Sequence, residues 1–398
     1  MESAYAWVRL ITSLLIGSVG SVGMWSVVVA LPAVQAEFNV ARADASLPYT
    51  LAMLGFGGGA VLIGRLVDRF GVVVPVIGAT LTLGFAFVAS GLAPNLMLFA
   101  LANLLIGVGS SASFAPLIAD ISHWFTRRRG IAVAICASGN YLGGAIWPPV
   151  VQRLIETSGW RTTQMIIGVV CIVAMLPLAL VLKRKLAAQQ EDAANAAAAG
   201  ATASLGLRPN ALFALLCIAG VSCCVAMSMP QVHIVAYCGD LGYGVARGAE
   251  MLSLMLGFGI ISRIASGFVA DRIGGVATLL IGSILQGVAL FLYLLFDGLT
   301  PLYVISALFG LFQGGIVPMY AIIVREYFPP RQAGTLVGLV IMSTILGMAL
   351  GGWTSGAIFD LTGSYWQAFA HGLAWNLLNG AIMAFLLMRR ARLRLVPA

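Results

Sequence analysis

Arg263 stands inside an apolar stretch, residues 249–269, eight residues before the polar pair Asp271-Arg272. On a helix that rises about 1.5 Å per residue, Arg263 is roughly 12 Å from that polar turn. It would then lie within a hydrocarbon layer about 30 Å thick if the helix spans a membrane. A cation at that depth is costly and indicates a functional site. Because a guanidinium pairs with both oxygens of a carboxylate, the residue predicts a binding site for an organic anion.

The neighbours of Arg263 on the helix are not acidic. The positions one helical turn away hold Gly259, Ile260, Ser266 and Gly267, and the acidic residues of the apolar stretches lie near their ends. This pattern favours an anionic ligand. Two alternatives stay open: Arg263 pairs with an acid on another helix, or its side chain extends to the cytoplasmic surface.

The composition indicates a polytopic membrane protein. Of 398 residues, 60% are hydrophobic and only 9% are charged, whereas soluble domains carry about 25% charged residues. The net charge of +8 reflects topology and predicts no nucleic-acid partner. The six cysteines lack the spacing of a metal site or a disulfide framework, and no cofactor is expected.

Twelve apolar stretches are long enough to span a bilayer at about 20 residues each. They are expected near residues 10–34, 47–66, 72–93, 95–122, 130–155, 162–182, 211–237, 249–269, 275–296, 300–324, 333–358 and 366–388. The predicted fold is an all-α membrane protein with 12 transmembrane helices in two six-helix bundles, 1–182 and 210–398, joined by a cytoplasmic linker, 183–209. The Ala-rich linker is expected to act as a tether.

The basic residues predict the orientation. With the N-terminus inside, 17 basic residues fall in cytoplasmic segments and four fall outside, namely Arg42, Arg153, Arg161 and Arg247. The positive-inside rule then places both termini in the cytoplasm. We expect a multi-pass protein of a bacterial inner membrane, with its first apolar stretch retained as a helix.

The two halves repeat at an offset of 203 to 204 residues. The motif glycine-x-x-x-aspartate-arginine-x-glycine follows the second stretch of each half. Its residues are Gly64, Asp68, Arg69 and Gly71 in the first half and Gly267, Asp271, Arg272 and Gly274 in the second. Two further landmarks recur in the same order, which indicates two bundles related by a parallel repeat.

This motif resembles the signature loop of the major facilitator superfamily, and the resemblance covers essentially the whole chain. It implies secondary transport by alternating access, with the two loops gating the cytoplasmic side. The glycines are expected to allow close helix approach and a tight turn. Asp120, near the inner end of the fourth stretch, is expected to pair with an arginine of the signature loop.

Within that superfamily the chain resembles the monocarboxylate porter and oxalate:formate antiporter group. The segment from Trp124 to Ala132 is similar to the entry of that group's fifth helix, and Gly159-Trp160-Arg161 fits its turn between helices five and six. The resemblance implies that Arg263, in helix eight, binds the substrate carboxylate. Gly259 stands where mammalian-type members carry aspartate, and helix eleven has no lysine. One central cation favours a monoanion.

Polar and aromatic residues at similar depth are candidates for the substrate wall. They are Trp25, Phe114, Asn140, Tyr141, Gln313, Tyr320 and Ser343. Packing within the bundles is the alternative for the aromatic residues, and bonding to their own backbone for the hydroxyls. His233 is the candidate for proton coupling, since its ordinary pKa range permits it. It follows Pro230, which we expect to break helix seven; a structural role for His233 is the alternative.

The sequence thus predicts a transporter, and not an enzyme, that moves a small organic anion, most simply a monocarboxylate with protons. The functional unit is expected to be a monomer in the lipid bilayer. Two alternatives are an anion exchanger of the oxalate:formate type and a ligand-sensing membrane protein without transport.

Overall fold

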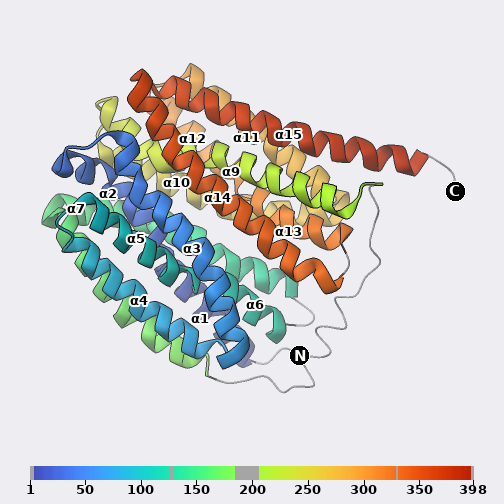
Figure 1. Cartoon of the computed structure of the whole chain (residues 1–398), viewed down its shortest axis with the longest axis horizontal. Coiled ribbons are helices and arrows are strands. Elements are labelled where there is room, and N and C mark those ends of the chain that lie inside the picture. Colours follow the sequence, from blue (N-terminus) through green and yellow to red (C-terminus); the bar gives the residue numbers. More distant parts are fainter. Residues whose placement is uncertain (1–3, 126–128, 184–205, 329, 396–398) are drawn as a thin grey trace. The chain divides into compact units, whose positions relative to one another are not determined.

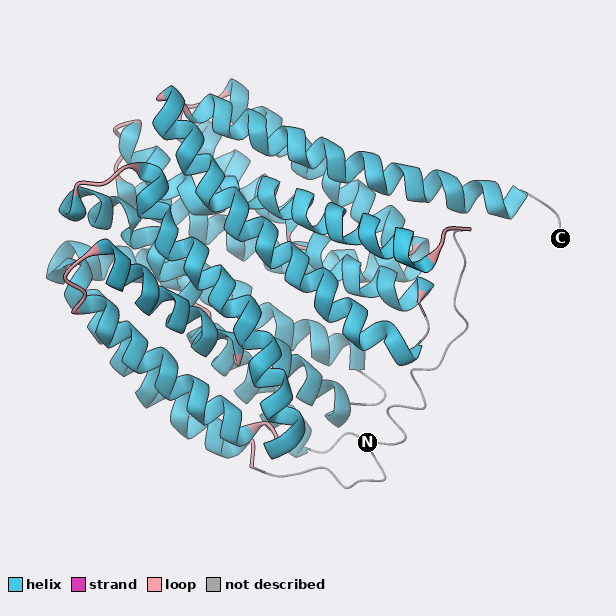
Figure 2. Cartoon of the chain, viewed as in Figure 1, coloured by secondary structure: helices cyan, strands magenta, loops and turns pink. Residues whose placement is uncertain are grey.

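The computed structural model describes residues 4–125, 129–183, 206–328 and 330–395. Within these ranges the secondary structure is helical, without strands (Figure 2). Most of the predicted linker and the arginine pair at positions 127 and 128 lie outside the described residues.

The helices follow the predicted order along the chain (Figure 1). In the first half they are α1 (Ala4–Gly20), α2 (Val22–Phe38), α3 (Arg42–Phe70), α4 (Val73–Gly91), α5 (Leu96–Ser111), α6 (Ala115–Trp124) and α7 (Arg129–Val181). In the second half they are α9 (Pro209–Asp240), α10 (Val245–Ile273), α11 (Gly275–Leu295), α12 (Leu299–Gln313), α13 (Ile316–Tyr327), α14 (Pro330–Thr362) and α15 (Tyr365–Leu395).

The described residues contain 11 helical segments long and apolar enough to cross a membrane. One of them lies in α7, whose 53 residues are interrupted at Gly159, with φ 77° and ψ 156°. An unbroken helix of that length would extend about 80 Å, far more than the ~30 Å hydrocarbon layer. Dividing α7 at Gly159 gives the twelve predicted spans, and the predicted fold class is confirmed.

Several spans consist of two helices, which the sequence analysis did not predict. The first is divided at Ser21, the fourth between Ser111 and Ala115, and the tenth between Gln313 and Ile316. The interruptions of the fourth and tenth spans occur at closely similar positions of the two halves under the repeat offset. Non-helical backbone at membrane depth is tolerated where protein or a cavity surrounds it.

Pro230 does not break its helix, so the predicted break is wrong. Helix α9 continues through Pro230 from Pro209 to Asp240. A proline removes only one backbone N–H. Because the bilayer core has no water that could replace the remaining backbone hydrogen bonds, those bonds keep the helix intact.

The chain divides into two compact units. The first unit comprises residues 1–196 and 233–257, and the second comprises residues 197–232 and 258–398. The first unit therefore includes the C-terminal part of α9 and the N-terminal part of α10. The division into bundles 1–182 and 210–398 stays a prediction.

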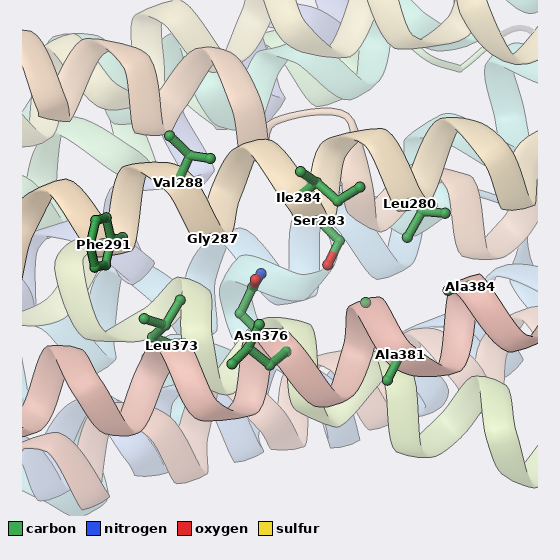
Figure 3. Close-up of a pocket in the computed structure, with 12 residues that line it drawn as sticks. Leu280, Ser283, Ile284, Gly287, Val288, Phe291, Leu373, Asn376, Ala381 and Ala384 are labelled. Carbon is green, nitrogen blue, oxygen red and sulfur yellow. The ribbon is translucent and has the colours of Figure 1, made fainter.

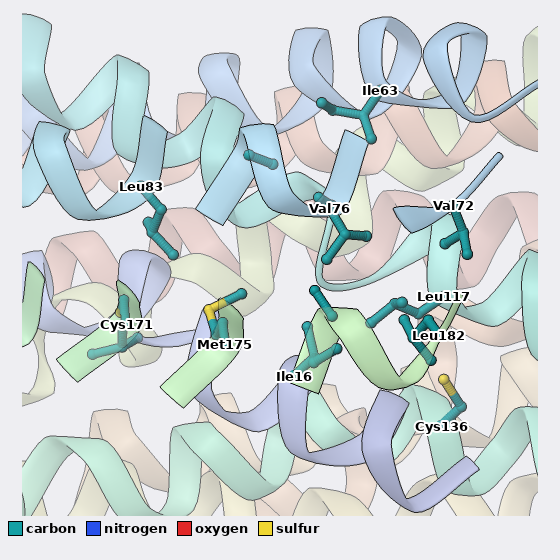
Figure 4. Close-up of a cluster of buried hydrophobic side chains, with 14 of the residues drawn as sticks. Ile16, Ile63, Val72, Val76, Leu83, Leu117, Cys136, Cys171, Met175 and Leu182 are labelled. Carbon is teal, nitrogen blue, oxygen red and sulfur yellow. The ribbon is translucent and has the colours of Figure 1, made fainter. Parts of the chain in front are cut away.

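Each unit has its own apolar core. In the first unit, buried side chains such as Ile16, Val76, Leu117 and Met175 pack together from α1, α4, α6 and α7 (Figure 4). In the second unit, Leu279, Ile323 and Met383 belong to a comparable cluster. These cores fix the helices that carry the candidate site.

Candidate functional site

Arg263 is buried within the second unit. Arg263, on α10, is 8% exposed, and its Nε donates a hydrogen bond to the carbonyl oxygen of Gly314 at 3.3 Å. This burial argues against the alternative in which the side chain extends to the aqueous surface. The guanidinium is therefore held at a helix interruption, with further N–H donors on the same group.

Glycines bring α10 against the α12–α13 interruption. A Cβ atom on Gly314 would collide with the carbonyl oxygen of Gly259, so only glycine permits this approach. The backbone N–H of Gly315 donates to the Ser262 hydroxyl at 3.1 Å. Ser262 and Arg263, consecutive on α10, thus hold the two residues that separate α12 from α13.

Gln313 ends α12 immediately before this interruption. Its side chain is fully buried, and neither its Oε1 nor its Nε2 atom has a hydrogen-bond partner in the described part of the chain. Buried polar groups are almost always bonded, and leaving one unsatisfied costs about 1–3 kcal/mol. An amide with both atoms unsatisfied, adjacent in sequence to the glycine that binds Arg263, is suited to a polar ligand.

The first unit brings two other candidates together at the contact of α2 with α7. Trp25 is 3% exposed and its indole nitrogen has no hydrogen-bond partner among the described residues. A Cβ on Gly144 would lie 2.8 Å from that nitrogen. Asn140, one turn before Gly144, donates from Nδ2 to the sulfur of Met24 at 3.6 Å, while its Oδ1 has no partner in the same described set. One donor and one acceptor therefore remain at this contact.

Two further candidates have hydroxyls bonded within the second unit. Tyr320 is fully buried and donates to Asn379 Oδ1 at 3.0 Å. The Ser343 hydroxyl donates to the carbonyl oxygen of Val340 at 2.7 Å, one turn earlier on α14. For Ser343 this bond corresponds to the alternative stated from the sequence.

The other wall candidates and His233 belong to the first unit. Phe114 lies in the α5–α6 interruption, with its ring 6.4 Å from that of Phe56. Tyr141 on α7 is 7% exposed, and His233 on α9 is fully buried. Since α9 is continuous at Pro230, His233 lies within a helix and not beside a helix break.

The repeated motif forms two similar turns. Gly71 and Gly274 have φ angles of 76° and 87°, which L side chains rarely adopt, and they end α3 and α10. The expected close helix approach is wrong for Gly64 and Gly267, because no atom lies within 4 Å of a Cβ added at either. Arg69, Asp271 and Arg272 are exposed. The Asp68 side chain is outside the described part.

Asp120 pairs with Arg9 of α1, and the predicted pairing with a signature-loop arginine is wrong. Arg9 donates from Nε to Asp120 Oδ2 at 2.6 Å and from Nη2 to Oδ1 at 2.8 Å. A third bond runs from Arg9 Nη1 to the Leu182 carbonyl at 2.9 Å. Among the 17 basic residues predicted to be cytoplasmic, Arg9 precedes the first apolar stretch directly, and this position is the one sequence signal that could have indicated a buried partner.

A second ion pair was not predicted. Arg42, at the start of α3, binds Asp240, at the end of α9, with Nη2 and Oδ2 2.9 Å apart. The Arg42 side chain is 7% exposed and that of Asp240 is 41% exposed. Both residues belong to the first unit, and the sequence predicted Arg42 on the outer side of the membrane.

The helical architecture and repeated turns define a multi-pass membrane protein built from two related halves. Residues 13–300 and 251–397 match the family model of the Major Facilitator Superfamily, and the chain belongs to that superfamily. This confirms the predicted resemblance.

Relatives include monocarboxylate transporters. Monocarboxylate transporter 13 of Bos taurus is 29% identical over 287 residues, which cover 71% of this chain and 65% of that protein. The match thus spans less than two thirds of that relative. Monocarboxylate transporter 11 of Mus musculus is 26% identical over 381 residues, covering 92% of this chain and 84% of the relative.

A solved structure supports the same fold. A bacterial homolog to the human lysosomal transporter Spinster, in an inward-facing and occupied conformation, has a TM-score of 0.71 and 15% sequence identity. The similarity covers 98% of this chain and 96% of the other. At this identity the likeness establishes the fold alone.

Proposed function

We propose that this protein is a secondary active transporter that moves a small monocarboxylate by alternating access. The observation that carries the proposal is the buried Arg263 guanidinium, bonded to the Gly314 carbonyl beside the unsatisfied amide of Gln313. The names of the monocarboxylate transporter relatives agree with this substrate class.

Arg263 is proposed to bind the carboxylate of the substrate. A guanidinium stays charged at physiological pH and offers two parallel N–H donors to a carboxylate. In a site shielded from water this pairing is stronger than in bulk solvent. Gln313 can then bond a polar atom close to the carboxylate, because its amide both donates and accepts.

Trp25 and Asn140 are proposed as further residues that contact the substrate. The indole N–H can donate, and the Asn140 Oδ1 can accept. Phe114 and Tyr141 are proposed as apolar wall residues, in keeping with sites that combine a few polar groups with aromatic surface. Tyr320 and Ser343 are weaker candidates because their hydroxyls already have acceptors.

We further propose proton symport, with His233 as the group that carries the proton. Histidine is suited to this step because its ordinary pKa lies near physiological pH. The two termini are proposed to be cytoplasmic, in a bacterial inner membrane, from the distribution of basic residues. The single chain is proposed as the functional unit.

Two measurements test the function. In a thermal-shift screen of the purified protein, small monocarboxylates should raise the melting temperature, since a ligand that binds the folded state stabilises it. In proteoliposomes, an inward proton gradient should drive accumulation of labelled monocarboxylate. Accumulation only when vesicles are preloaded with a second anion would instead establish exchange. Binding without uptake under either condition would favour a ligand sensor.

A further inference from the structure

A groove opens on the side of the second unit between α11 and α15 (Figure 3). It encloses about 550 Å³. Its rims are apolar and open outward: Ile284 is 57% exposed, Phe291 is 49% exposed and Leu377 is 64% exposed. Because both helices are membrane spans, this opening lies at the depth of the lipid chains.

The floor of the groove is closed by small and mutually bonded side chains. Asn379 Nδ2 donates to the Ser283 hydroxyl at 3.1 Å, and Asn376 Nδ2 donates to Gln286 Oε1 at 3.1 Å. Figure 3 shows Ser283 and Asn376 between the two helices. Each of these amide nitrogens therefore has an acceptor within the protein, and with its apolar rims the groove suits a hydrocarbon chain.

The length of the groove matches one leaflet of a bilayer. Along α11 it extends from Leu280 to Phe291, which is roughly 16 Å at 1.5 Å per residue. Half of the hydrocarbon thickness is about 15 Å. An acyl chain that enters from one side of the membrane would therefore fill it end to end.

Cations lie at one end of this groove. Helices α11 and α15 are antiparallel, with Gly287 opposite Asn376 and Ser283 opposite Asn379. Further along α15, Arg390 reaches the residues just before α11, where its Nη1 donates to the Ile273 carbonyl at 3.2 Å. Arg390 is six residues past Ala384, the last lining residue of α15. That is about 9 Å along the axis, near the ~6 Å depth of a headgroup layer.

Two further arginines belong to the same end. Arg389 donates to the Gly206 carbonyl at 3.3 Å, and Arg272 borders a shallow hollow with Phe268, Val269 and Ile273. A guanidinium has five N–H groups, so one bond to a carbonyl leaves donors for a phosphate. The charge at this end is complementary to an anionic headgroup.

We propose that the α11–α15 groove binds an anionic phospholipid, with one acyl chain along the groove and the phosphate at Arg390 and its neighbouring arginines. Each arginine near an anionic membrane surface contributes about 1 kcal/mol, which corresponds to about fivefold in occupancy. The site thereby prefers phosphatidylglycerol over phosphatidylcholine with the same chains.

The test uses the full-length protein in phosphatidylcholine nanodiscs that contain a minor amount of lipid with a diazirine on its acyl chain. The probe is phosphatidylglycerol in one sample and phosphatidylcholine in the other. After illumination, peptides from α11 and α15 should carry at least about fivefold more phosphatidylglycerol than phosphatidylcholine adducts, since about fivefold is the contribution of a single arginine. Equal labelling by the two lipids, or phosphatidylglycerol adducts confined to other helices, would overturn the site.

Variants distinguish the contribution of the lipid headgroup to binding from that of the acyl chain. Arg390→Gln should lower the preference about fivefold, while Arg390→Lys should keep it, because the charge is retained. Gly380→Leu should fill the groove and reduce adducts of both lipids there; Gly78→Leu on α4, where no atom lies within 4 Å of an added Cβ, is the matched control. Arg153→Gln, whose side chain is 78% exposed in the first unit, is the charge control.

Two results would contradict the proposal directly. One is an undiminished phosphatidylglycerol preference in Arg390→Gln. The other is the absence of lipid adducts on α11 and α15 in nanodiscs whose mass corresponds to two copies of the protein, which would assign the groove to self-association.

Discussion

The Arg9 guanidinium holds both carboxylate oxygens of Asp120, at 2.6 Å and 2.8 Å, and so joins α1 to α6 inside the first unit. The Arg9 side chain is only 2% exposed, and its third bond reaches the Leu182 carbonyl, at the end of α7. A buried pair of this kind fixes three helices in one arrangement.

Removing one member of this pair should destabilise the protein more than removing both. Asp120→Ala leaves a buried cation without its carboxylate and should lower the free energy of unfolding by about 3 kcal/mol. The double variant Arg9→Met, Asp120→Leu should recover most of the loss. Denaturant unfolding in detergent, with Arg153→Ala as the exposed control, measures both. A double variant as unstable as Asp120→Ala would contradict this account.

Arg263→Ala should abolish monocarboxylate uptake, and Arg263→Lys should reduce it at least about tenfold, because lysine keeps the charge and loses the two parallel donors. Initial rates of labelled substrate in proteoliposomes check this. Ser266→Ala, one turn further along α10, is the control, since the Ser266 hydroxyl donates to its own helix at the Ser262 carbonyl. Unchanged uptake in Arg263→Ala would remove the anchor role.

Gln313→Leu should separate stability from function. Because both amide atoms of Gln313 lack partners in the described structure, leucine should leave stability unchanged or raise it by about 1 kcal/mol, yet weaken substrate-induced stabilisation. Gln286→Leu is the matched control: its amide accepts from Asn376 and donates to the Cys223 carbonyl, so leucine should lower stability. An undiminished rise in melting temperature with substrate in Gln313→Leu would show that the amide has no role in recognition.

His233→Gln should make uptake independent of an imposed pH gradient while preserving substrate binding, since glutamine keeps hydrogen bonding and cannot carry a proton. Uptake with and without the gradient, alongside thermal shifts with substrate, gives both readouts. His371→Gln, on α15, is the control. A gradient dependence equal to that of the unmodified protein would exclude His233 from coupling.

Gly314→Ala should disturb the contact that holds Arg263. A methyl group there would meet the Gly259 carbonyl, a backbone atom that can move only with its helix. We expect a loss of about 2 kcal/mol in stability and a weaker substrate response. Gly338→Ala on α14, with no atom within 4 Å, should be neutral. Comparable melting temperatures for the two variants would refute the close-contact explanation.

The sequence indicated the spans, the repeat and Arg263 because each depends on local features. Apolar length, the recurring motif, and a cation at membrane depth can all be recognised without knowing which helices touch. The type and depth of Trp25 and Asn140 make them candidates, and the structure places them at one helix contact.

The helix interruptions and ion pairs could not be found in the same way. Both interruptions, Ser111 to Ala115 and Gln313 to Ile316, fall within apolar stretches long enough to span the membrane. Hydropathy alone therefore does not distinguish a break from a continuous helix. At Pro230 the sequence predicted a break that is absent. Proline is a strong local signal for a helix break, but in apolar surroundings the other backbone hydrogen bonds keep α9 continuous. Asp120 required knowledge of which arginine is its neighbour in space.

The interruptions after Ser111 and Gln313 have a mechanical consequence. A helix is stiff along its axis while its backbone hydrogen bonds are continuous, and it can bend where they are interrupted. Each half of the repeat therefore contains one span, the fourth or the tenth, that can bend at its interruption. Phe114 lies in the interruption of the fourth span, and Gln313 directly precedes that of the tenth. Bending at these interruptions can move two candidate substrate contacts, Phe114 and Gln313, while the helices on either side of each interruption stay folded.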